Sequence, residues 1–333
     1  MAEWLYEAGI GENRAVLVED DSIVEALIER EGAGLAAGAI LSARLTEIVV
    51  PGRRGIATTE TGEQALVEPL PPGVTHGATF VAEVMREAIG EARRAKLAKV
   101  RAAPAGETPR PAPTLAERIA ATGTRVTRLT NHGPDRLEAA GWSELLEEAT
   151  TGEIRFIGGA LDVALTPAMT LIDVDGHLPP AALAVAGARA ASQAIRRHGI
   201  AGSIGIDLPT VPDKSARLAA AEAFDSALPQ PFERTAVNGF GFLQIVRRRE
   251  RRSLPELIQR NPVRAAALAL LRTGERAQGA GVRTLVAAPA VIALIAAESA
   301  WTDALARRAG TAIALRAEPA LAISAAYVET EHP

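Results

Sequence analysis

Apolar and polar residues alternate along the first part of the chain, as they do in half-buried β-strands. Residues 3–9 and 15–28 alternate around a Gly-Glu-Asn turn, which predicts a β-hairpin. Between Gly38 and Arg101, short strand-like runs follow one another, separated by Gly and Pro turns. Several short strands at such close spacing predict a small β-barrel such as an OB-fold. This part of the chain is therefore expected to consist mainly of β-strands.

A proline-rich segment separates this part from one with a different pattern. Residues 102–113 contain four prolines, which predicts a linker or exposed loop. Beyond it, helical and strand-like runs alternate. The helical runs lie at 114–121, 134–149, 180–198 and 213–228, and the strand-like runs at 153–158, 160–165, 169–175, 202–208 and 240–248. Strands that alternate with crossover helices predict an α/β layer.

The C-terminal part has the pattern of a second, smaller α/β unit. Residues 255–276 are predicted to be helical, and a strand, a helix and two strands follow at 283–289, 290–309, 311–316 and 321–328. The expected fold class is therefore α/β, more fully α+β with several domains. The most apolar stretch, 285–297, contains Pro289 and ends at Glu298, so it is too short to span a bilayer and is predicted to be core.

The start of the chain is acidic and lacks a basic segment followed by an apolar one. We therefore expect no secretory signal and a cytoplasmic location.

Cysteine is absent from the 333 residues. Its absence excludes a disulfide framework, a thiol nucleophile, an iron–sulfur cluster and cysteine-ligated zinc. Any metal ion must be held by carboxylates, His or carbonyl groups.

The net charge of −4 is unevenly distributed along the sequence. Residues 1–50 carry a net charge of −7, whereas residues 91–130 and 244–276 each carry +6. One basic run alone would be explained most simply as a solvated face. Two such tracts in an acidic protein predict a localised site for a polyanion.

Two strand-like runs end abruptly in aspartate. They are TLIDVDG, which contains Asp173 and Asp175, and IGIDLP, which contains Asp207. If these strands are adjacent and parallel, their carboxyl ends meet at one edge of the sheet, where α/β proteins bind ligands. Mg²⁺ is held in this way by one or two carboxylates. An isolated Asp at a strand end could equally be a turn or helix-cap residue.

These runs and the segment after them resemble the ribonuclease E/G family. TLIDVDGH, a helix, GIAGSIGIDLP and RTAVNGFGFLQIVRRRERRSL match, in order, that family's I-D-x-N strand, its G-G-x-I-x-I-D strand and its F-G-L-x-x-x-x-R-x-R-x-S-L segment. The similarity implies that residues 151–254 form a catalytic metal-binding subdomain of DNase I-like type.

The resemblance extends in the same order over most of the chain and implies further domains. Residues 1–36 are similar to the family's opening hairpins, which 114–150 would complete as a remnant RNase H-like subdomain. Residues 37–101 are similar to its OB-fold RNA-binding module, with 102–113 as the linker. Residues 255–333 correspond to its small C-terminal domain.

The same resemblance implies roles for individual residues. Asp173 and Asp207 fall on the two metal-binding aspartates, and Asp175 replaces the usual Asn. These three carboxylates are thus expected to be catalytic and to hold Mg²⁺ or Mn²⁺, with Asp175 as an additional ligand or as a modifier of ion choice. The residues implied in RNA binding are Arg94, Lys96, Lys99, Arg234, Phe240, Arg247 and Arg249. For Lys96, a solvated position at a strand end is an equally good interpretation.

The chain also departs from the family pattern. The family's sensor for a five-prime monophosphate is missing from the short stretch 102–150, so sensing of that end is not assigned. Ile56, Ala57 and Thr58 replace the aromatic platform of the OB-like module, so base stacking there should be weak. The segment SLPELIQRNPVR lacks the family's zinc-linking Cys pair. No zinc is therefore expected, and a homodimer would form through the C-terminal domain.

The resulting expectation is a metal-dependent endoribonuclease that cleaves single-stranded RNA. The alternative is a non-catalytic RNA-binding or ribosome-assembly factor on the same scaffold, and a third possibility is a metal-dependent phosphodiesterase acting on DNA or a small nucleotide. Among the histidines, the candidates for catalytic groups are His132, His177 and His198. His177 follows VDG directly and could transfer a proton, but a surface-loop position is the simpler interpretation.

Overall fold

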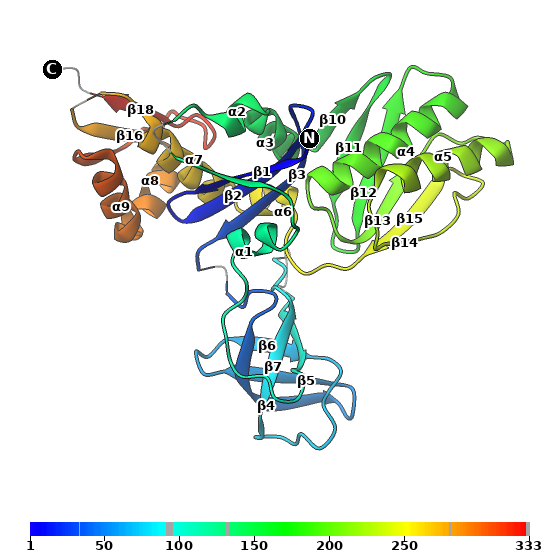
Figure 1. The fold of residues 1–333 in the computed structure, drawn as a ribbon, viewed down its shortest axis with the longest axis horizontal. Coiled ribbons are helices and arrows are strands. Elements are labelled where there is room, and N and C mark those ends of the chain that lie inside the picture. The colour runs from blue at the N-terminus through cyan, green and yellow to red at the C-terminus, as the bar shows by residue number, and fades with distance from the viewer. Residues whose placement is uncertain (33, 91–95, 131–132, 280, 331–333) are drawn as a thin grey trace. The chain divides into compact units, whose positions relative to one another are not determined.

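The chain alternates between two structural units. Unit 1 is built from residues 1–31, 119–152 and 254–333, and unit 2 from residues 32–118 and 153–253. The computed structural model describes residues 1–32, 34–90, 96–130, 133–279 and 281–330. Over these residues the fold is mixed α/β, with several open sheets and one closed barrel (Figure 1).

Unit 1 begins with a sheet whose strand order is β3-β2-β1-β9. Its strands are β1 (Glu3–Ala8), β2 (Glu12–Glu19), β3 (Ser22–Arg30) and β9 (Val126–Leu129). The predicted hairpin is confirmed as the antiparallel pair β1 and β2. A second hairpin inside the predicted run 15–28 was missed. It turns at Asp20 and Asp21, whose φ angles are 48° and 62°, a left-handed conformation that Asp tolerates.

The helices of unit 1 pack on this sheet and on a smaller one. They are α2 (Arg136–Ala139), α3 (Trp142–Thr151), α6 (Leu254–Gln259), α7 (Pro262–Arg276), α8 (Pro289–Ala297) and α9 (Ser299–Ala309). The smaller sheet has the order β17-β16-β18, from Ile313–Ala317, Arg283–Ala287 and Tyr327–Thr330. Apolar side chains from both sheets and these helices form the two cores of the unit.

Three helices predicted as continuous are broken in the structure. The run 134–149 is interrupted at Gly141, where φ is 98°. The run 255–276 restarts at Asn261, whose side chain accepts the N–H of Arg264 at the start of α7. The run 290–309 changes direction at Glu298. The strand predicted at 321–328 was wrong over most of its length, because these residues form turns until Tyr327.

Unit 2 contains the closed barrel, which confirms the predicted small β-barrel. Its strands are β4 (Ile40–Val50), β5 (Arg54–Thr59), β6 (Gln64–Val67), β7 (Thr79–Arg86) and β8 (Ala98–Ala102), in the order β4-β5-β6-β8-β7. β6 and β8 run parallel, and the other pairs are antiparallel. Within the segment 102–113, Arg110 exchanges both backbone hydrogen bonds with Ile40. The short helix α1 (Leu115–Ala120) follows.

Unit 2 also contains a six-stranded sheet covered by two helices. The order is β10-β11-β12-β13-β15-β14, from Glu153–Phe156, Gly159–Leu165, Thr170–Gly176, Gly202–Asp207, Phe242–Arg247 and Glu233–Arg234. The helices α4 (Pro180–Arg197) and α5 (Lys214–Ala227) lie side by side over the sheet (Figure 1). The predicted α/β layer is therefore confirmed.

Helix α4 approaches the sheet closely at one glycine. A Cβ atom on Gly187 would lie 2.3 Å from Cγ1 of Val174 in β12. Val174 is β-branched and buried, so it has little freedom to move aside. The small residue at this position thus sets the distance between α4 and β12, the strand that carries Asp173.

Within the described residues, no single helix has both the length and the apolarity needed to cross a bilayer. Helices α8 and α9 meet that test only when they are taken together, and they meet at an angle of 87°.

We predict that Gly187→Val lowers the free energy of unfolding by about 1–3 kcal/mol, because overpacking a tight contact costs that much. Ala182→Val is the matched control, since Ala182 is an exposed residue of the same helix. Urea unfolding followed by circular dichroism measures both variants. Equal stability of the two variants would contradict the proposed close contact.

Candidate functional site

Strand β12 carries two aspartates on its exposed face. Along this strand, Ile172 and Val174 are buried in the core beneath the helices, whereas Asp173 and Asp175 are exposed. The alternation arises because successive side chains of a strand point to opposite faces of the sheet. The prediction that the two carboxylates share a face is confirmed.

Strand β13 brings a third aspartate to the same edge of the sheet. β12 and β13 are parallel neighbours, and Asp173 pairs with Asp207 in their register. Neighbouring strands lie about 4.8 Å apart, so the two paired residues occupy adjacent places on the exposed face. The expectation that these strands end together is also confirmed.

A fourth carboxylate, which the sequence did not single out, lies on the other side of Asp173. Asp162 of β11 pairs with Asp173, and Glu153 of β10 pairs with Asp162. All of these side chains are exposed. Acidic residues from four successive strands therefore form one row across the sheet. The run ALDVAL shows that Asp162 is the polar residue of a strand, but only the antiparallel pairing shows which residue lies beside it.

The next row of the sheet contains a cation. Arg155 of β10 pairs with Ala160, which pairs with Asp175. The Arg155 side chain is 84% exposed and its Nε lies 2.9 Å from Oε1 of Glu153. Sequence reasoning missed this residue because it lies outside both basic tracts.

The carboxylates affect each other's ionisation. Partial burial raises the pKa of Asp173, and the negative charges of Asp175, Asp207 and Asp162 raise it further. A hydrogen bond from the backbone N–H of Val174 acts in the opposite direction and lowers the pKa of Asp173. This carboxyl therefore binds a proton more readily than an isolated Asp.

The donor set suits a hard divalent cation that keeps part of its water shell. Among the described residues, no group of three or more His, Asp or Glu side chains is gathered closely enough to form a full ligand set. Mg²⁺ typically uses only one or two protein carboxylates and completes its octahedron with water and substrate oxygens. The paired Asp173 and Asp207, with Asp175 on the same face, fit that mode of binding.

Apolar groups adjoin the carboxylates on the same face of the sheet. Phe242 of β15 pairs with Asp207, but its ring reaches diagonally across to Gly205. A Cβ atom on Gly205 would lie 2.5 Å from Cζ of Phe242 and 3.0 Å from Cδ2 of Leu171. Gly205 thus leaves space for the ring. Phe242 and Leu171 form an apolar surface over this glycine, two residues along the strands from Asp173 and Asp207. The resemblance to the ribonuclease E/G family implies Phe240, not Phe242, as the aromatic residue near the RNA.

Phe240 lies in the loop that precedes β15, close to the end of β13. Its side chain is 82% exposed. The hydroxyl of Thr210 donates to the carbonyl of Phe240 at 3.0 Å, and the backbone N–H of Leu208 donates to the carbonyl of Gly241 at 3.2 Å. These bonds hold an exposed ring beside the strand end that carries Asp207.

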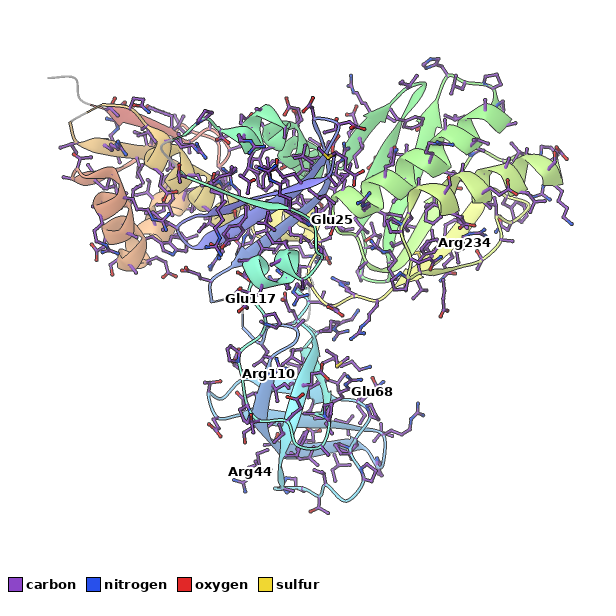
Figure 2. All side chains as sticks on the ribbon, viewed as in Figure 1. Glu25, Arg44, Glu68, Arg110, Glu117 and Arg234 are labelled. Atoms are coloured by element: carbon purple, nitrogen blue, oxygen red, sulfur yellow. The ribbon has the colours of Figure 1, made fainter. Side chains whose placement is uncertain are left out.

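Three of the predicted RNA-binding arginines lie away from the row of carboxylates. Arg247 pairs with Gly202 at the amino end of β13, and Arg249 lies against the same glycine. That end of the strand is about 17 Å from Asp207. The Arg247 guanidinium donates to the carbonyl of Ile200 at 3.0 Å. Arg234 forms a bidentate ion pair with Asp225 of α5, with Nε 2.6 Å from Oδ1 (Figure 2).

The remaining basic candidates belong to the barrel. Lys96 is exposed and bonds through its backbone to Ile89, and Lys99 of β8 pairs with Glu68 at 2.9 Å. Figure 2 labels Glu68 on the barrel. Arg94 lies outside the described residues, as does His132. Of the other histidines, His177 is exposed in the loop after β12 and His198 is buried at the end of α4.

No protein-family model matches the chain, and a search of the curated proteins finds no match either. The assignment of function therefore depends on the geometry of the site and on the sequence motifs themselves.

The raised pKa of Asp173 has a consequence for stability. A carboxyl whose pKa is higher in the folded state than in the unfolded state stabilises the fold at low pH, and this contribution is lost as the pH rises through the folded-state pKa. Ionised Asp173 therefore opposes folding at neutral pH. We predict that Asp173→Asn raises the melting temperature at pH 7 in EDTA. The gain should disappear at about pH 3, where the Asp carboxyl is protonated.

Scanning calorimetry across this pH range measures the effect. Glu222→Gln is the control, because Glu222 is an exposed acidic residue of α5. It should leave the melting temperature nearly unchanged at both pH values. A lower melting temperature for Asp173→Asn at pH 7 would show that the ionised carboxylate does not oppose folding.

Proposed function

We propose that the protein is a metal-dependent endoribonuclease that cleaves single-stranded RNA, located in the cytoplasm. The observation that carries this proposal is the pairing of Asp173 with Asp207 on the exposed face of the sheet, with Asp162 and Asp175 beside them. The resemblance of these strands to the catalytic motifs of the ribonuclease E/G family supports the same assignment.

The carboxylates in this proposal hold a divalent cation. Asp173 and Asp207 are its ligands, and Asp175 assists from the next exposed position of β12. Bound Mg²⁺ or Mn²⁺ would activate water and neutralise the charge that develops on a phosphoryl oxygen. Without a cation, a row of acidic side chains would repel an RNA phosphate, so the need for metal follows from the charge of the site.

The reaction proposed is hydrolysis of one phosphodiester bond. A water oxygen attacks phosphorus in line with the leaving oxygen, the bond from phosphorus to the three-prime oxygen breaks, and that oxygen takes up a proton. The products are a five-prime phosphate and a three-prime hydroxyl. Arg155, on the exposed face with Asp175, is suited to contact a neighbouring phosphate of the strand.

We assign the barrel of unit 2 to the OB type. The order β4-β5-β6-β8-β7, with the third and fifth strands parallel, supports this assignment. Ala57 lies in the barrel core, and no aromatic residue occupies positions 56–58. RNA binding by the barrel would therefore depend on contacts to phosphates and decrease with salt concentration. The six-stranded sheet with two covering helices supports a DNase I-like assignment for 151–254.

Phe242 is proposed to contact a base next to the cleaved phosphate. Its ring lies against Gly205 beside Leu171. Asp173 and Asp207 lie two residues further along these two strands. An aromatic ring supplies about 1–3 kcal/mol of stacking energy to one base without reading its identity. This role compensates for the missing aromatic platform of the barrel.

We predict that Asp173→Asn and Asp207→Asn each lower the rate of RNA cleavage by about 100-fold or more, because each removes one ligand of the cation. The assay uses an end-labelled, unstructured RNA oligomer with Mg²⁺, Mn²⁺ or EDTA. Both variants should still shift the oligomer in a gel. Glu222→Gln is the control and should cleave at the wild-type rate.

The same assay distinguishes the rival functions. An oligomer that is bound but remains intact in either metal would identify a non-catalytic RNA-binding protein and refute the enzyme. A DNA oligomer, run in parallel, should remain intact. Its cleavage at an equal rate would favour a general phosphodiesterase.

We predict that Phe242→Leu lowers cleavage about 5- to 100-fold, whereas Phe242→Tyr, which keeps the ring, stays within about threefold. Oligomers with one abasic nucleotide, placed in turn on each side of the cleavage site, locate the contact. One position should slow the wild type strongly and leave Phe242→Leu unaffected. Equal sensitivity of both proteins at every position would exclude a base contact by this ring.

A further inference from the structure

Unit 1 contains an open cavity of about 650 Å³. It is formed by β2, β3, α3, α6, α7 and the turn before β18, all within the one unit. Small-molecule sites in proteins typically have volumes of about 300–1,000 Å³ and combine apolar walls with a few polar groups. The size of this cavity therefore suits a small organic ligand, and nothing in the proposed RNA chemistry uses it.

The walls of the cavity are mainly aliphatic. They include Ile28, Leu146, Ile258, Ala266, Ala269 and Leu270. Helix α7 presents small residues here, among them Ala266 and Ala269, which leaves the space open. A ligand with an apolar body would remove these side chains from water and gain affinity from their burial.

The polar part of the lining is a buried group of charges. Glu12 is 2% exposed, and its two carboxylate oxygens bond to two different arginines. Nε of Arg30 lies 2.7 Å from Oε2, and Nη1 of Arg272 lies 2.7 Å from Oε1. The side chains of these arginines are only 6% and 10% exposed. One carboxylate thus faces two buried guanidinium groups.

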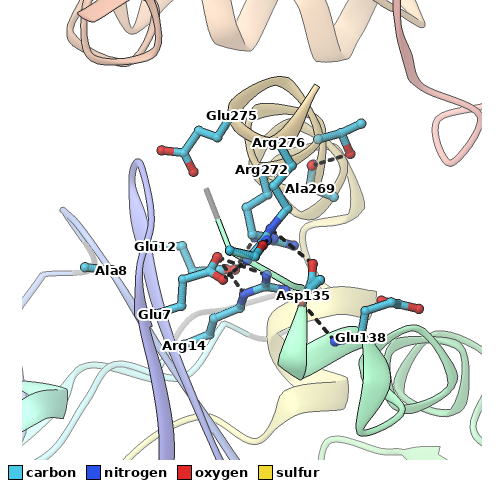
Figure 3. Close-up of polar contacts among 12 residues, drawn as sticks. Glu7, Ala8, Glu12, Arg14, Asp135, Glu138, Ala269, Arg272, Glu275 and Arg276 are labelled. Atoms are coloured by element: carbon cyan, nitrogen blue, oxygen red, sulfur yellow. Dashed lines mark hydrogen bonds and ion pairs between the residues drawn. The ribbon is translucent and has the colours of Figure 1, made fainter. Parts of the chain in front are cut away.

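Further charged residues lie beside Glu12 and Arg272 (Figure 3). Glu7 bonds to Arg14 and Arg276, and Asp135 also pairs with Arg276. In this second set, two carboxylates face two guanidinium groups, so its charges balance. Burial lowers the pKa of Arg14, and the nearby positive charge of Arg272 lowers it further.

Two further acidic residues lie near these groups, and the charge of Arg272 also acts on one of them, Glu275. Glu147 lines the cavity but is exposed, so water screens its charge. Glu275 is paired with Arg308 and forms a neutral pair. Among the ion pairs of the described residues that line the cavity, the single carboxylate of Glu12 therefore faces two guanidinium groups, a local surplus of one positive charge. Keeping a charge out of water is costly unless a partner compensates it.

We propose that this cavity binds a small amphipathic anion. The ligand has an apolar body that lies along α7 and one carboxylate or phosphate head that faces Arg30 and Arg272. The apolar walls provide binding energy, and the surplus charge selects an anion over a neutral or cationic molecule of the same shape. This proposal is independent of the RNA site, since all the residues that carry it belong to unit 1.

The first test uses 1-anilinonaphthalene-8-sulfonate, an apolar monoanion that fluoresces when it leaves water. The full-length protein should bind it with a stoichiometry of one. Octanoate or octyl phosphate should displace it, whereas octyltrimethylammonium and octanol should be at least tenfold weaker competitors. The better of the two anions identifies the head group. Displacement by octyltrimethylammonium at the same concentration as octanoate would overturn the proposal.

The second test places the ligand in this cavity. Ala269→Phe fills the space and keeps every charged side chain, and Arg272→Gln removes one guanidinium group while Glu12 keeps its bond to Arg30. Each should weaken probe binding at least tenfold. Ala219→Phe adds the same ring to an exposed site on α5 and should change binding less than twofold.

Circular dichroism and melting curves verify that each variant is folded. If Arg272→Gln does not fold, the competitor series on the wild type and Ala269→Phe still decide the question. Unchanged probe binding by folded Ala269→Phe would show that the cavity is not the binding site.

Discussion

The packing of α4 and α5 against one face of the six-stranded sheet determines the character of the opposite face. Ile172, Val174, Ile204 and Ile206 must point toward these helices to form the core. Because side chains alternate along a strand, the residues between them must point away. The carboxylates of β12 and β13 are therefore exposed as a direct consequence of the hydrophobic core, and the strand register aligns them.

Acidic residues have different surroundings in the two units. In unit 1, Glu7 and Glu12 are buried and each bonds to two arginines, an arrangement that joins distant parts of the chain. In unit 2, the row of acidic residues is exposed, and partial burial together with the negative charges of its neighbours raises the pKa of Asp173. Buried ion pairs thus join separate stretches of the chain in unit 1, whereas in unit 2 exposed carboxylates repel one another.

The sequence predicted those features that depend on local pattern. Alternation in TLIDVDG and IGIDLP indicated two strands that end in aspartate, and the short strands before residue 102 indicated the barrel. It could not show that Asp162 lies beside Asp173 or that Phe242 covers Gly205, because both depend on pairing between strands. Arg234 was predicted to bind RNA from its place beside a motif, but its ion pair with α5 is a tertiary contact.

Unit 1 is assembled from three separated stretches of the chain, and this imposes an order on its folding during synthesis. Glu7 and Glu12 are made first, yet Arg272 and Arg276 belong to the last stretch. At roughly 5–20 residues per second, the ribosome needs several more seconds after residue 253 to supply residues 254–333. All of unit 2 is already translated by then, so the nascent chain can complete the six-stranded sheet while Glu7 and Glu12 still await Arg276 and Arg272.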